Sequence, residues 1–380
     1  MEGKKIFWLV GEASGDLHAS LVMRALNAEL PGLQHIGIGG TRMQAEGLKP
    51  LFPFARFNVM GFVEVLRHLG FFLKVQNRVK KLLKDERPDL AILVDYPGLN
   101  LRIAALADEL RVPVLYFICP QFWAWKHERV HKLRASVKHV ACILPFEKEL
   151  LDIHNVSATY VGHPIAEEVS FELSREEFAV FYGLDPAKQW LGFLPGSRDV
   201  EIRRMLPVFL EAARLFDPDR FEFLFSKART VNHFLYMDLL HSSSLQRPCI
   251  IDGYHYEMMK YCDFIVSTSG TATLETAFIG TPLVICYKAS PISYQLGKHF
   301  IRVRHIGLPN IILDDDILPE LIQSGLTPTA VKDAVLGILD DPVRLAEIKQ
   351  QLSRLRSILA EKRTSEQMLS LVKNLLGIEV

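Results

Sequence analysis

Two loops in the second half of the chain carry residue types that could bind a phosphate group. The stretch FIVSTSGTATLE joins an apolar run typical of a strand to a helical pattern. The main-chain N–H groups of Gly270, Thr271 and Ala272 would then point at a ligand above the strand, where a phosphate fits. Glu275 lies one helical turn after Thr271 and could accept hydrogen bonds from a ribose diol. The alternative is that Ser269 and Thr271 only cap the helix.

A second loop strengthens the phosphate interpretation. In WLGFLPGSRDVEIRRM, the residues Gly196, Ser197 and Arg198 follow the first apolar run of the same half. Arg198 would project from a helix N-terminus as a permanently charged ligand. Two helix N-termini and one arginine can hold a pyrophosphate without a metal, so the pair of loops favours a nucleotide-sugar diphosphate. An ordinary surface arginine is the alternative.

Carboxylates follow apolar runs in the first half. In LAILVDYPGLN, Asp95 ends an expected strand, where it could take a proton from an attacking hydroxyl group. It could equally order the turn before Pro97 and Gly98. The stretch GEASGD, with Glu12, Ser14 and Asp16, matches neither the dinucleotide fingerprint nor the P-loop. We expect its acids to act as a helix cap, an acceptor contact or a helper of the base, in that order.

Three short motifs could suggest a metal, and the sequence argues against each. HERVH (127–131) matches the zincin pattern, but basic residues surround it and Val137 stands where a third histidine would be needed. The D-x-D patterns at 217–219 and 314–316 do not follow apolar strands in the required manner, and acidic loops before helices are common. We therefore expect no metal and no other cofactor.

The elements that must position these residues alternate along the chain. Short β-rich runs alternate with helical segments in both halves, which is typical of parallel α/β sheets. YVGHPIAEEV resembles a crossover between two such series. We expect two Rossmann-like domains, an acceptor domain over 1–164 and a nucleotide-sugar domain over 165–345, facing across a cleft, with C-terminal helices over 346–380. In such sheets ligands bind beyond the carboxyl ends of the strands.

Composition limits the classes of partner. The chain has 380 residues, 49% of them apolar, and its 44 basic residues balance 44 acidic ones, so nothing favours nucleic acid. Five cysteines without a C-x-x-C pair fit reduced thiols in a cytoplasmic protein. The longest uncharged apolar stretch is shorter than a membrane span and contains Pro120 and Gln121. The protein is expected to be soluble or to sit on a membrane without crossing it.

The segment MGFVEVLRHLGFFLKVQNRVKKLLK (60–84) carries more apolar surface than one buried helix face requires. Basic residues follow its apolar part, so it could dock on an anionic membrane surface. A core helix with a solvated basic side is the alternative. The expected membrane or acyl contacts are Met60, Phe62, Val63, Leu66, Leu69, Phe71 and Phe72.

Taken in order, the motifs resemble one family, the lipid-A-disaccharide synthases of Gram-negative bacteria. The resemblance covers nearly the whole chain. It rests on ten stretches: GEASGD, GTRMQAEG, VMGFVEVL, VDYPGLN, PQFWAW, LPFEKE, VGHP, LPGSR, STSGTATLE and GLPNIIL. It implies a metal-independent, inverting glycosyltransferase of GT-B fold. Its substrates would be UDP-2,3-diacylglucosamine and 2,3-diacylglucosamine 1-phosphate (lipid X), giving a β-1,6-linked disaccharide phosphate and UDP.

The resemblance also assigns roles to residues. It makes Asp95 the general base and Arg198 a ligand of the donor diphosphate. It places Ser269, Gly270, Thr271 and Glu275 in the nucleotide loop. It adds Asn310 of GLPN to the donor site. The expected acceptor contacts are Glu12, Ser14, Asp16, Asn100, Gln121 and Trp123.

Two further expectations follow from the resemblance. The enzyme would associate peripherally with the cytoplasmic face of the inner membrane, and it could form a homodimer that exchanges C-terminal segments. Family members usually carry a serine where this chain has Cys119, so Cys119 is not expected to be essential. The rival interpretations are a UDP-N-acetylglucosamine 2-epimerase of the same fold and an inert, membrane-associated nucleotide-sugar binder.

Overall fold

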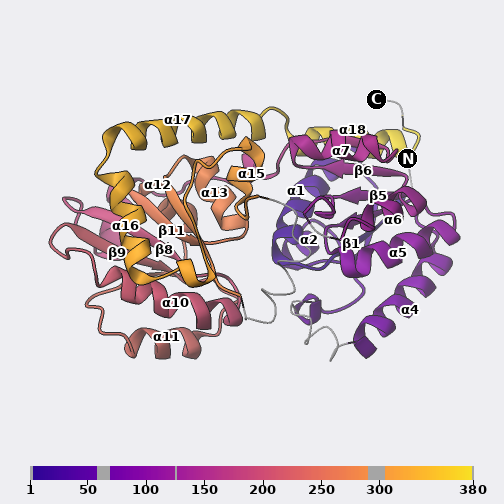
Figure 1. Cartoon of the computed structure of the whole chain (residues 1–380). Coiled ribbons are helices and arrows are strands. Elements are labelled where there is room, and N and C mark those ends of the chain that lie inside the picture. Colours follow the sequence, from indigo (N-terminus) through magenta and orange to yellow (C-terminus); the bar gives the residue numbers. More distant parts are fainter. Residues whose placement is uncertain (1–2, 58–68, 125, 290–303, 379–380) are drawn as a thin grey trace. The chain divides into compact units, whose positions relative to one another are not determined.

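The computed structural model describes residues 3–57, 69–124, 126–289 and 304–378. The chain divides into two compact units (Figure 1). The first contains residues 1–164 and 361–380, and the second contains residues 165–360. Each unit is built on one sheet, and the strand pairings described in both sheets are parallel. The parallel α/β organisation expected from the alternating runs is therefore present in each unit.

The first sheet has the strand order β3-β2-β1-β4-β5-β6-β7. The order reverses between β1 and β4, because the chain runs outward to β3 on one side and to β7 on the other. This reversal is where doubly wound sheets bind ligands. The strands are β1 Lys5–Val10, β2 Gln34–Ile38, β3 Lys49–Pro50, β4 Leu90–Val94, β5 Val114–Phe117, β6 His139–Cys142 and β7 Ala158–Tyr160.

The second sheet repeats this plan with the order β10-β9-β8-β11-β12-β13. Its reversal lies between β8 and β11, the two strands that precede LPGSR and STSG. The strands are β8 Gln189–Leu194, β9 Phe221–Ser226, β10 Cys249–Ile251, β11 Phe264–Thr268, β12 Leu283–Tyr287 and β13 Glu320–Ile322. The central strands of both sheets are almost wholly buried, which explains their unbroken apolar sequences.

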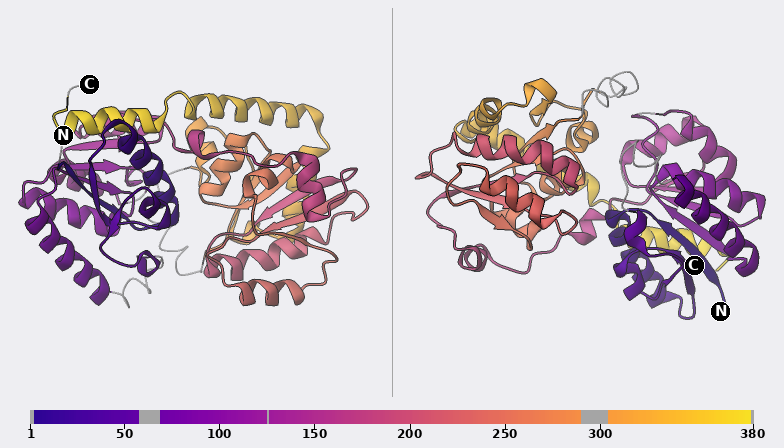
Figure 2. Two further views of the ribbon diagram at one scale, coloured as in Figure 1. Left: turned by 180° about the vertical axis from the view of Figure 1, so that it is seen from behind. Right: turned by 90° about the horizontal axis from the view of Figure 1, so that it is seen from below.

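Helices cover both faces of the first sheet (Figures 1 and 2). Helices α1, α2 and α18 lie on one face, and α4, α5 and α6 lie on the other. Trp8 of β1 is fully buried between these layers. The helices are α1 Ala13–Glu29, α2 Thr41–Ala45, η1 Phe54–Phe57, α4 Leu69–Glu86, α5 Pro97–Glu109, α6 Arg129–Ser136, α7 Pro145–Ile153 and α18 Thr364–Leu375.

The second sheet is covered in the same way. Helices α10, α11 and α16 form one layer, and α12, α13 and α17 form the other. Trp190 of β8 is fully buried. The helices are α8 Ile165–Glu168, α9 Arg175–Tyr182, α10 Asp199–Ala213, α11 His233–His241, α12 His255–Tyr261, α13 Thr271–Ile279, α15 Leu308–Leu313, η2 Gln323–Gly325, α16 Pro328–Leu339 and α17 Pro342–Leu359.

The C-terminal helices divide between the units. Helix α17 packs on α13, and its Leu352, Leu355 and Leu359 are fully buried, so the second unit extends to residue 360 and not to 345. Helix α18 packs on α1 of the first unit, where Met368 and Val372 are fully buried. The segment expected as a separate C-terminal region thus belongs partly to each core. Within the described ranges, no helix combines the length and apolar character that crossing a bilayer requires.

Candidate active site

Asp95 follows β4, beside the reversal of the first sheet. Asp95 and Tyr96 both adopt the left-handed backbone conformation, with φ of 44° and 47°. The main-chain carbonyl of Asp95 accepts hydrogen bonds from Tyr116 Oη at 2.6 Å and from Asn100 Nδ2 at 2.7 Å. Such a turn is strained for residues with a side chain and persists because buried neighbours hold it. The surrounding fold therefore fixes the position of the carboxyl group.

The carboxyl group of Asp95 has an unusual pKa. Burial, first, and the negative charge of Glu12, second, raise the pKa of Asp95 from 3.8 to about 7. The main-chain N–H of Tyr96 and the electrostatic effects of His18 and Arg129 act in the opposite direction without cancelling the shift. A carboxylate with a pKa near 7 accepts a proton more readily than an ordinary aspartate at neutral pH. This is the property that a general base needs.

Asn100, expected as an acceptor contact, supports this turn from inside. Its side chain is fully buried in α5. Besides the Asp95 carbonyl, Nδ2 donates to the main-chain carbonyl of Val94 at 3.0 Å. The amide therefore ties the end of β4 to the start of α5, and Asn100 acts by positioning Asp95.

GEASGD connects β1 to α1 on the other side of the reversal. Gly11 packs directly against Tyr96, since a Cβ added at Gly11 would lie 2.3 Å from the Tyr96 ring. Glu12 and Ser14 are half-buried at the start of α1. Because Glu12 raises the pKa of both Asp95 and Tyr96, its carboxylate lies close enough to act on the base. The loop is therefore part of the Asp95 environment.

Asp16, also in GEASGD, caps a helix other than its own. Its Oδ1 accepts hydrogen bonds from Gly40 N at 2.7 Å and Met43 N at 3.2 Å, and its Oδ2 accepts one from Arg42 N at 3.2 Å. These N–H groups surround the N-terminus of α2, where a carboxylate also interacts favourably with the helix dipole. The expected cap is present, but it stabilises α2 and leaves the side chain buried.

Two histidines of this unit were not predicted from the sequence. His18 of α1 and His163 are both buried, with ring centroids 6.4 Å apart. Burial, and to a lesser degree His18, lower the pKa of His163 to about 3, so His163 is neutral at physiological pH. His18 also lowers the pKa of Asp95. Two features of the sequence could have indicated these histidines. His18 lies four residues after Ser14, on the same face of α1, and His163 is the histidine of VGHP.

Trp123 of the PQFWAW segment contacts a second buried acid, Glu147 of LPFEKE. Trp123 Nε1 donates to Glu147 Oε1 at 3.1 Å, and Glu147 Oε2 accepts from Leu144 N at 3.2 Å. Burial raises the pKa of Glu147 to about 8, with a smaller contribution from Asp95. Glu147, which was not among the residues predicted from the sequence, thus holds Trp123, whereas the expected contact Gln121 is exposed.

In the second unit, LPGSR connects β8 to α10, and Arg198 stands directly before the helix. Arg198 Nη1 contacts Glu201 Oε1 at 2.9 Å, and Ser197 N donates to Glu201 Oε2 at 2.9 Å. Gly196 has a φ of 119°, a conformation that favours glycine. The loop therefore gathers a main-chain N–H and a guanidinium group around one carboxylate.

STSG connects β11 to α13 at the other strand of the same reversal. Gly270 and Thr271 are exposed, and a Cβ added at Gly270 would meet nothing within 4 Å. The alternative, in which Ser269 caps the helix, is not seen, because its Oγ donates to the main-chain carbonyl of Ile306 at 3.3 Å. The N-terminus of α13 is thus open to solvent, with Glu275 half-buried one turn further on.

Asn310, expected in the donor site, is fully buried in α15. Its Nδ2 donates to Leu318 O at 2.9 Å and to Glu320 Oε1 at 3.0 Å, and its Oδ1 accepts from Leu318 N at 3.0 Å. Glu320 in turn accepts from the main-chain N–H groups of Ile306 and Gly307. This network fixes the segment around Ile306, whose main-chain carbonyl accepts the hydrogen bond from the Ser269 hydroxyl. Asn310 therefore organises the loop around STSG.

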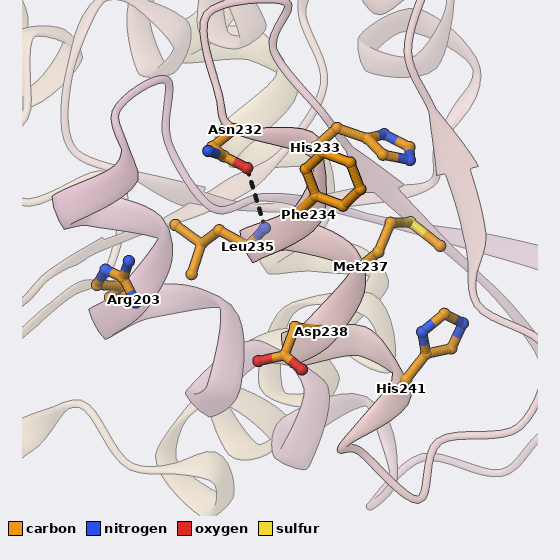
Figure 3. A pocket seen from close by; sticks show the side chains of 8 residues that line it. All are labelled: Arg203, Asn232, His233, Phe234, Leu235, Met237, Asp238 and His241. Carbon is orange, nitrogen blue, oxygen red and sulfur yellow. Dashed lines mark hydrogen bonds between the residues drawn. The ribbon is translucent and has the colours of Figure 1, made fainter.

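An open groove of about 750 Å³ lies between α10 and α11 (Figure 3). Asn232 caps α11 by accepting a hydrogen bond from Leu235 N, and its own N–H donates to Asp199 Oδ1 at 2.9 Å, next to LPGSR. Phe234 is 83% exposed. The lining residues are Arg203, Asn232, His233, Phe234, Leu235, Met237, Asp238 and His241.

The motifs that resembled metal sites have other contacts. His127, His131 and His154 pack ring against ring, with centroids 4.8 to 6.4 Å apart. Asp316 pairs with Arg304 and His305. Within the described ranges, no group of three histidine, cysteine, aspartate or glutamate residues is placed to hold a metal ion.

The expected membrane contacts fall largely outside the described residues. Met60, Phe62, Val63 and Leu66 lie there, and of Leu69 only the backbone is described. Phe71 and Phe72 are half-buried. The Phe71 ring lies 5.3 Å from the Phe57 ring, and Phe72 lies 6.4 Å from Tyr96, measured between centroids. Both phenylalanines therefore take part in the core beside Asp95.

Comparison with known proteins identifies the family. The family described as lipid-A-disaccharide synthetase matches residues 6–375. The chain belongs to this family. The lipid-A-disaccharide synthase of Geobacter metallireducens is 40% identical over 378 residues, covering 98% of both chains. That of Trichlorobacter lovleyi is 39% identical over 376 residues, covering 97% of this chain and 98% of the relative. The resemblance inferred from the ten motifs is confirmed.

Solved structures show the fold. A UDP-GlcNAc 2-epimerase from Neisseria meningitidis bound to UDP-GlcNAc superposes with a TM-score of 0.65 at 12% identity, covering 98% of this chain and 100% of the other. The glycosyltransferase of kitacinnamycin superposes with a TM-score of 0.63 at 15% identity, covering 99% and 100%. The predicted GT-B fold class is confirmed. Epimerases share only the fold, whereas the sequence relatives are synthases, so the epimerase interpretation is not favoured.

Proposed function

We propose that the chain transfers the diacylglucosamine of UDP-2,3-diacylglucosamine to the 6-hydroxyl group of lipid X. The acceptor oxygen bonds to the anomeric carbon as the bond from that carbon to the diphosphate breaks. The products are UDP and the β-1,6-linked disaccharide 1-phosphate. One observation carries the proposal: in a chain of this family, a carboxylate with a pKa near 7 stands at the reversal of one sheet, and two loops that each lead into a helix N-terminus stand at the reversal of the other.

Asp95 serves as the general base in this proposal. It accepts the hydroxyl proton, and its raised pKa supports that role. Glu12 and His18 tune its charge, while Asn100 and Tyr116 hold its turn. The acceptor contacts proposed from the loops around it are Glu12, Ser14, Gln121 and Trp123.

The second unit binds the donor in this proposal. Arg198 and the main-chain N–H groups of the two loops stabilise the charge of the departing UDP, which is the role that a metal plays elsewhere. Glu275 accepts hydrogen bonds from the ribose. Asn310 acts through the loop that it fixes. The residues proposed to face the donor are Gly196, Ser197, Arg198, Ser269, Gly270, Thr271 and Glu275.

Two acylated substrates suggest work at a membrane surface. We propose peripheral association with the cytoplasmic face of the inner membrane through residues 60–75 and the basic side of α4. That side exposes Leu73, Lys74, Arg78 and Lys81, whereas Val75 and Val79 are buried. We also propose that a homodimer, where it forms, exchanges α18. The same contacts with α1 would then be made by the partner's helix.

The function is tested by incubating the purified chain with both acylated substrates in detergent, with and without EDTA. We expect disaccharide phosphate and UDP in equal amounts in both cases. Absence of product rejects the synthase proposal, and loss of product only with EDTA would restore the metal motifs. UDP-N-acetylglucosamine alone should remain unchanged, because its conversion to a second sugar nucleotide would indicate an epimerase. An inert binder would bind UDP and release none from the donor.

A further inference from the structure

Glu201 places a carboxylate on the loop proposed to hold the donor phosphates. Its Oε2 accepts a hydrogen bond from Ser197 N, and its Oε1 contacts Arg198 Nη1, both at 2.9 Å. A main-chain N–H and a guanidinium group are also the donors that a phosphate oxygen would use. Glu201 therefore occupies the position of an anionic ligand.

The backbone of the loop is shaped around this carboxylate. Gly196 has a φ of 119°, and a Cβ added there would lie 2.6 Å from Glu201 Oε2. The loop is also anchored at points that do not involve Glu201. Thr230 Oγ1 donates to Ser197 O at 2.7 Å, and Asn232 N donates to Asp199 Oδ1 at 2.9 Å. The anion-binding conformation can therefore persist when the carboxylate leaves.

Glu201 is free to leave at modest energetic cost. The contact with Arg198 spans three residues of one helix start, and the side chains are 46% and 23% exposed, so the pair resembles a surface ion pair. A diphosphate carries more charge than a carboxylate and presents several oxygens. Two anions cannot share Ser197 N, and like charges held this close repel each other.

We propose that Glu201 is an internal competitor of the donor: it fills one phosphate subsite in the empty enzyme, is displaced when the diphosphate binds, and returns when UDP leaves. This inference rests on the proposed binding of a UDP-sugar at LPGSR. The returning carboxylate neutralises Arg198 and reoccupies Ser197 N, which promotes product release. Glu201 is thus a positioning residue that sets the affinity for the diphosphate.

Glu201→Gln tests the proposal in the full chain. The glutamine keeps an acceptor oxygen for Ser197 N and removes the charge. UDP should bind the variant more tightly, by roughly fivefold, the lower end of ordinary coupling between competing ligands. Affinity for uridine should be unchanged, because uridine has no phosphate. Titration calorimetry at low ionic strength measures both ligands, and inorganic pyrophosphate serves as a third probe.

A matched control and a second variant make the result decisive. Glu211→Gln neutralises an acid of the same helix whose partner is Arg214, and it should leave UDP affinity unchanged. Glu201→Ala should bind UDP at least as tightly as Glu201→Gln. Weaker or equal UDP binding in both Glu201 variants overturns the proposal, since Glu201 would then be a permanent support of Arg198.

The two proposals can fail separately. If the wild-type chain neither binds UDP nor forms disaccharide, the proposed function fails. If it does both while the ratio of UDP to uridine affinity is the same in Glu201→Gln as in wild type, only the competitor role fails. During turnover, Glu201→Gln should show stronger product inhibition by UDP, in proportion to its gain in UDP affinity.

Discussion

At the scale of single residues, Asp95 is held in an environment that lowers the stability of the fold. Its backbone is left-handed, its carboxyl group is buried, and Glu12 adds a second negative charge nearby. Each of these features disfavours the folded state or the ionised carboxylate, and hydrogen bonds from Tyr116 and Asn100 hold the arrangement in place. Strain and a raised pKa at one residue are typical of a functional site.

Replacing Asp95 by asparagine should remove the base and little else. Asparagine tolerates the left-handed backbone better than alanine does, and the contacts with Tyr116 and Asn100 use the main chain. We expect the turnover number to fall by about 10² to 10⁴, the usual contribution of a general base. UDP affinity, measured by calorimetry, should stay within about twofold, because the residues proposed to bind UDP belong to the second unit and Asp95 belongs to the first. A collapse of UDP binding would show that Asp95 is structural.

Asp95→Asn should also be more stable than the wild type at high pH. The Asp95 carboxyl group titrates at about 7 when folded and at 3.8 in an ordinary environment. Between these values the unfolded chain has released a proton that the folded chain keeps, so the free energy of unfolding falls as the pH rises, and the loss is complete above pH 7. Asparagine avoids this loss. Asp95→Asn should gain up to about 4 kcal/mol relative to the wild type at pH 8, and the gain should vanish towards pH 4.

Urea unfolding at several pH values measures this difference. A gain that is the same at pH 4 and pH 8 would contradict the titration of Asp95. The pH profile of turnover gives an independent check. The wild-type rate should fall as the pH drops through about 7, because the base becomes protonated.

At the scale of elements, both sheets place their functional loops at the reversal of strand order. GEASGD and Asp95 follow β1 and β4, while LPGSR and STSG follow β8 and β11. Parallel strands end at one edge, so loops distant in sequence meet there. Helix α4, in contrast, offers a surface along its length and not a loop at its end. It buries Val75, Val79 and Leu83 and turns a basic side to solvent.

The basic side of α4 should carry much of the attraction to anionic lipid. Lys74, Arg78 and Lys81 recur at intervals of four and three residues and are all exposed. Replacing the three by glutamine should weaken binding to vesicles containing phosphatidylglycerol by roughly 100-fold, at about 1 kcal/mol for each basic residue. Sedimentation with vesicles at low ionic strength measures the effect.

A control removes the same charge elsewhere. Arg344, Lys349 and Arg354 are exposed on α17, and their triple replacement by glutamine should change vesicle binding much less. Equal losses in the two variants would mean that net charge, and not α4, governs membrane binding. Neutral vesicles should not distinguish either variant from the wild type.

The sequence predicted the elements better than the side-chain contacts. Runs such as IFWLV and LAILV are unbroken and apolar, so their burial as central strands was evident, whereas β3, with the sequence KP, exists only because β2 pairs with it. Asp16 was expected to cap, but its partner helix begins 25 residues later, at Thr41. His18 and His163 meet through folding, and no local pattern encodes that distance.

The donor loops illustrate the same division. The Gly-Ser-Arg and Ser-Gly-Thr spacings predicted helix N-termini, and α10 and α13 begin there. Whether a side chain faces the ligand depends on tertiary packing. Asn310 was therefore assigned to the donor site from its motif alone, although its side-chain amide donates hydrogen bonds to Leu318 O and Glu320 Oε1.

At the scale of the whole molecule, the C-terminal segment returns to the first unit after α17 completes the second. Gly162, in the link between the units, has a φ of 82°, and an added Cβ would lie 2.2 Å from the carbonyl oxygen of Lys362. The chain therefore passes this point with no room for a side chain. Beyond it, α18 packs on α1, the helix that begins in GEASGD. Loss of α18 should thus destabilise α1 and, through it, the surroundings of Asp95.

Met368→Ala in α18 should weaken the first unit selectively. Met368 is fully buried, and truncating such a side chain costs about 2 to 5 kcal/mol. Hydrogen exchange read by mass spectrometry should show faster exchange in peptides of β1 and α1 and unchanged exchange in β8 and β11. Leu352→Ala in α17 is the matched control and should do the reverse, since Leu352 is fully buried in the second unit. If α18 is exchanged within a dimer, the effect of Met368→Ala should grow as the protein is diluted, because dissociation then exposes α1. An effect independent of concentration would mean that each chain retains its own α18.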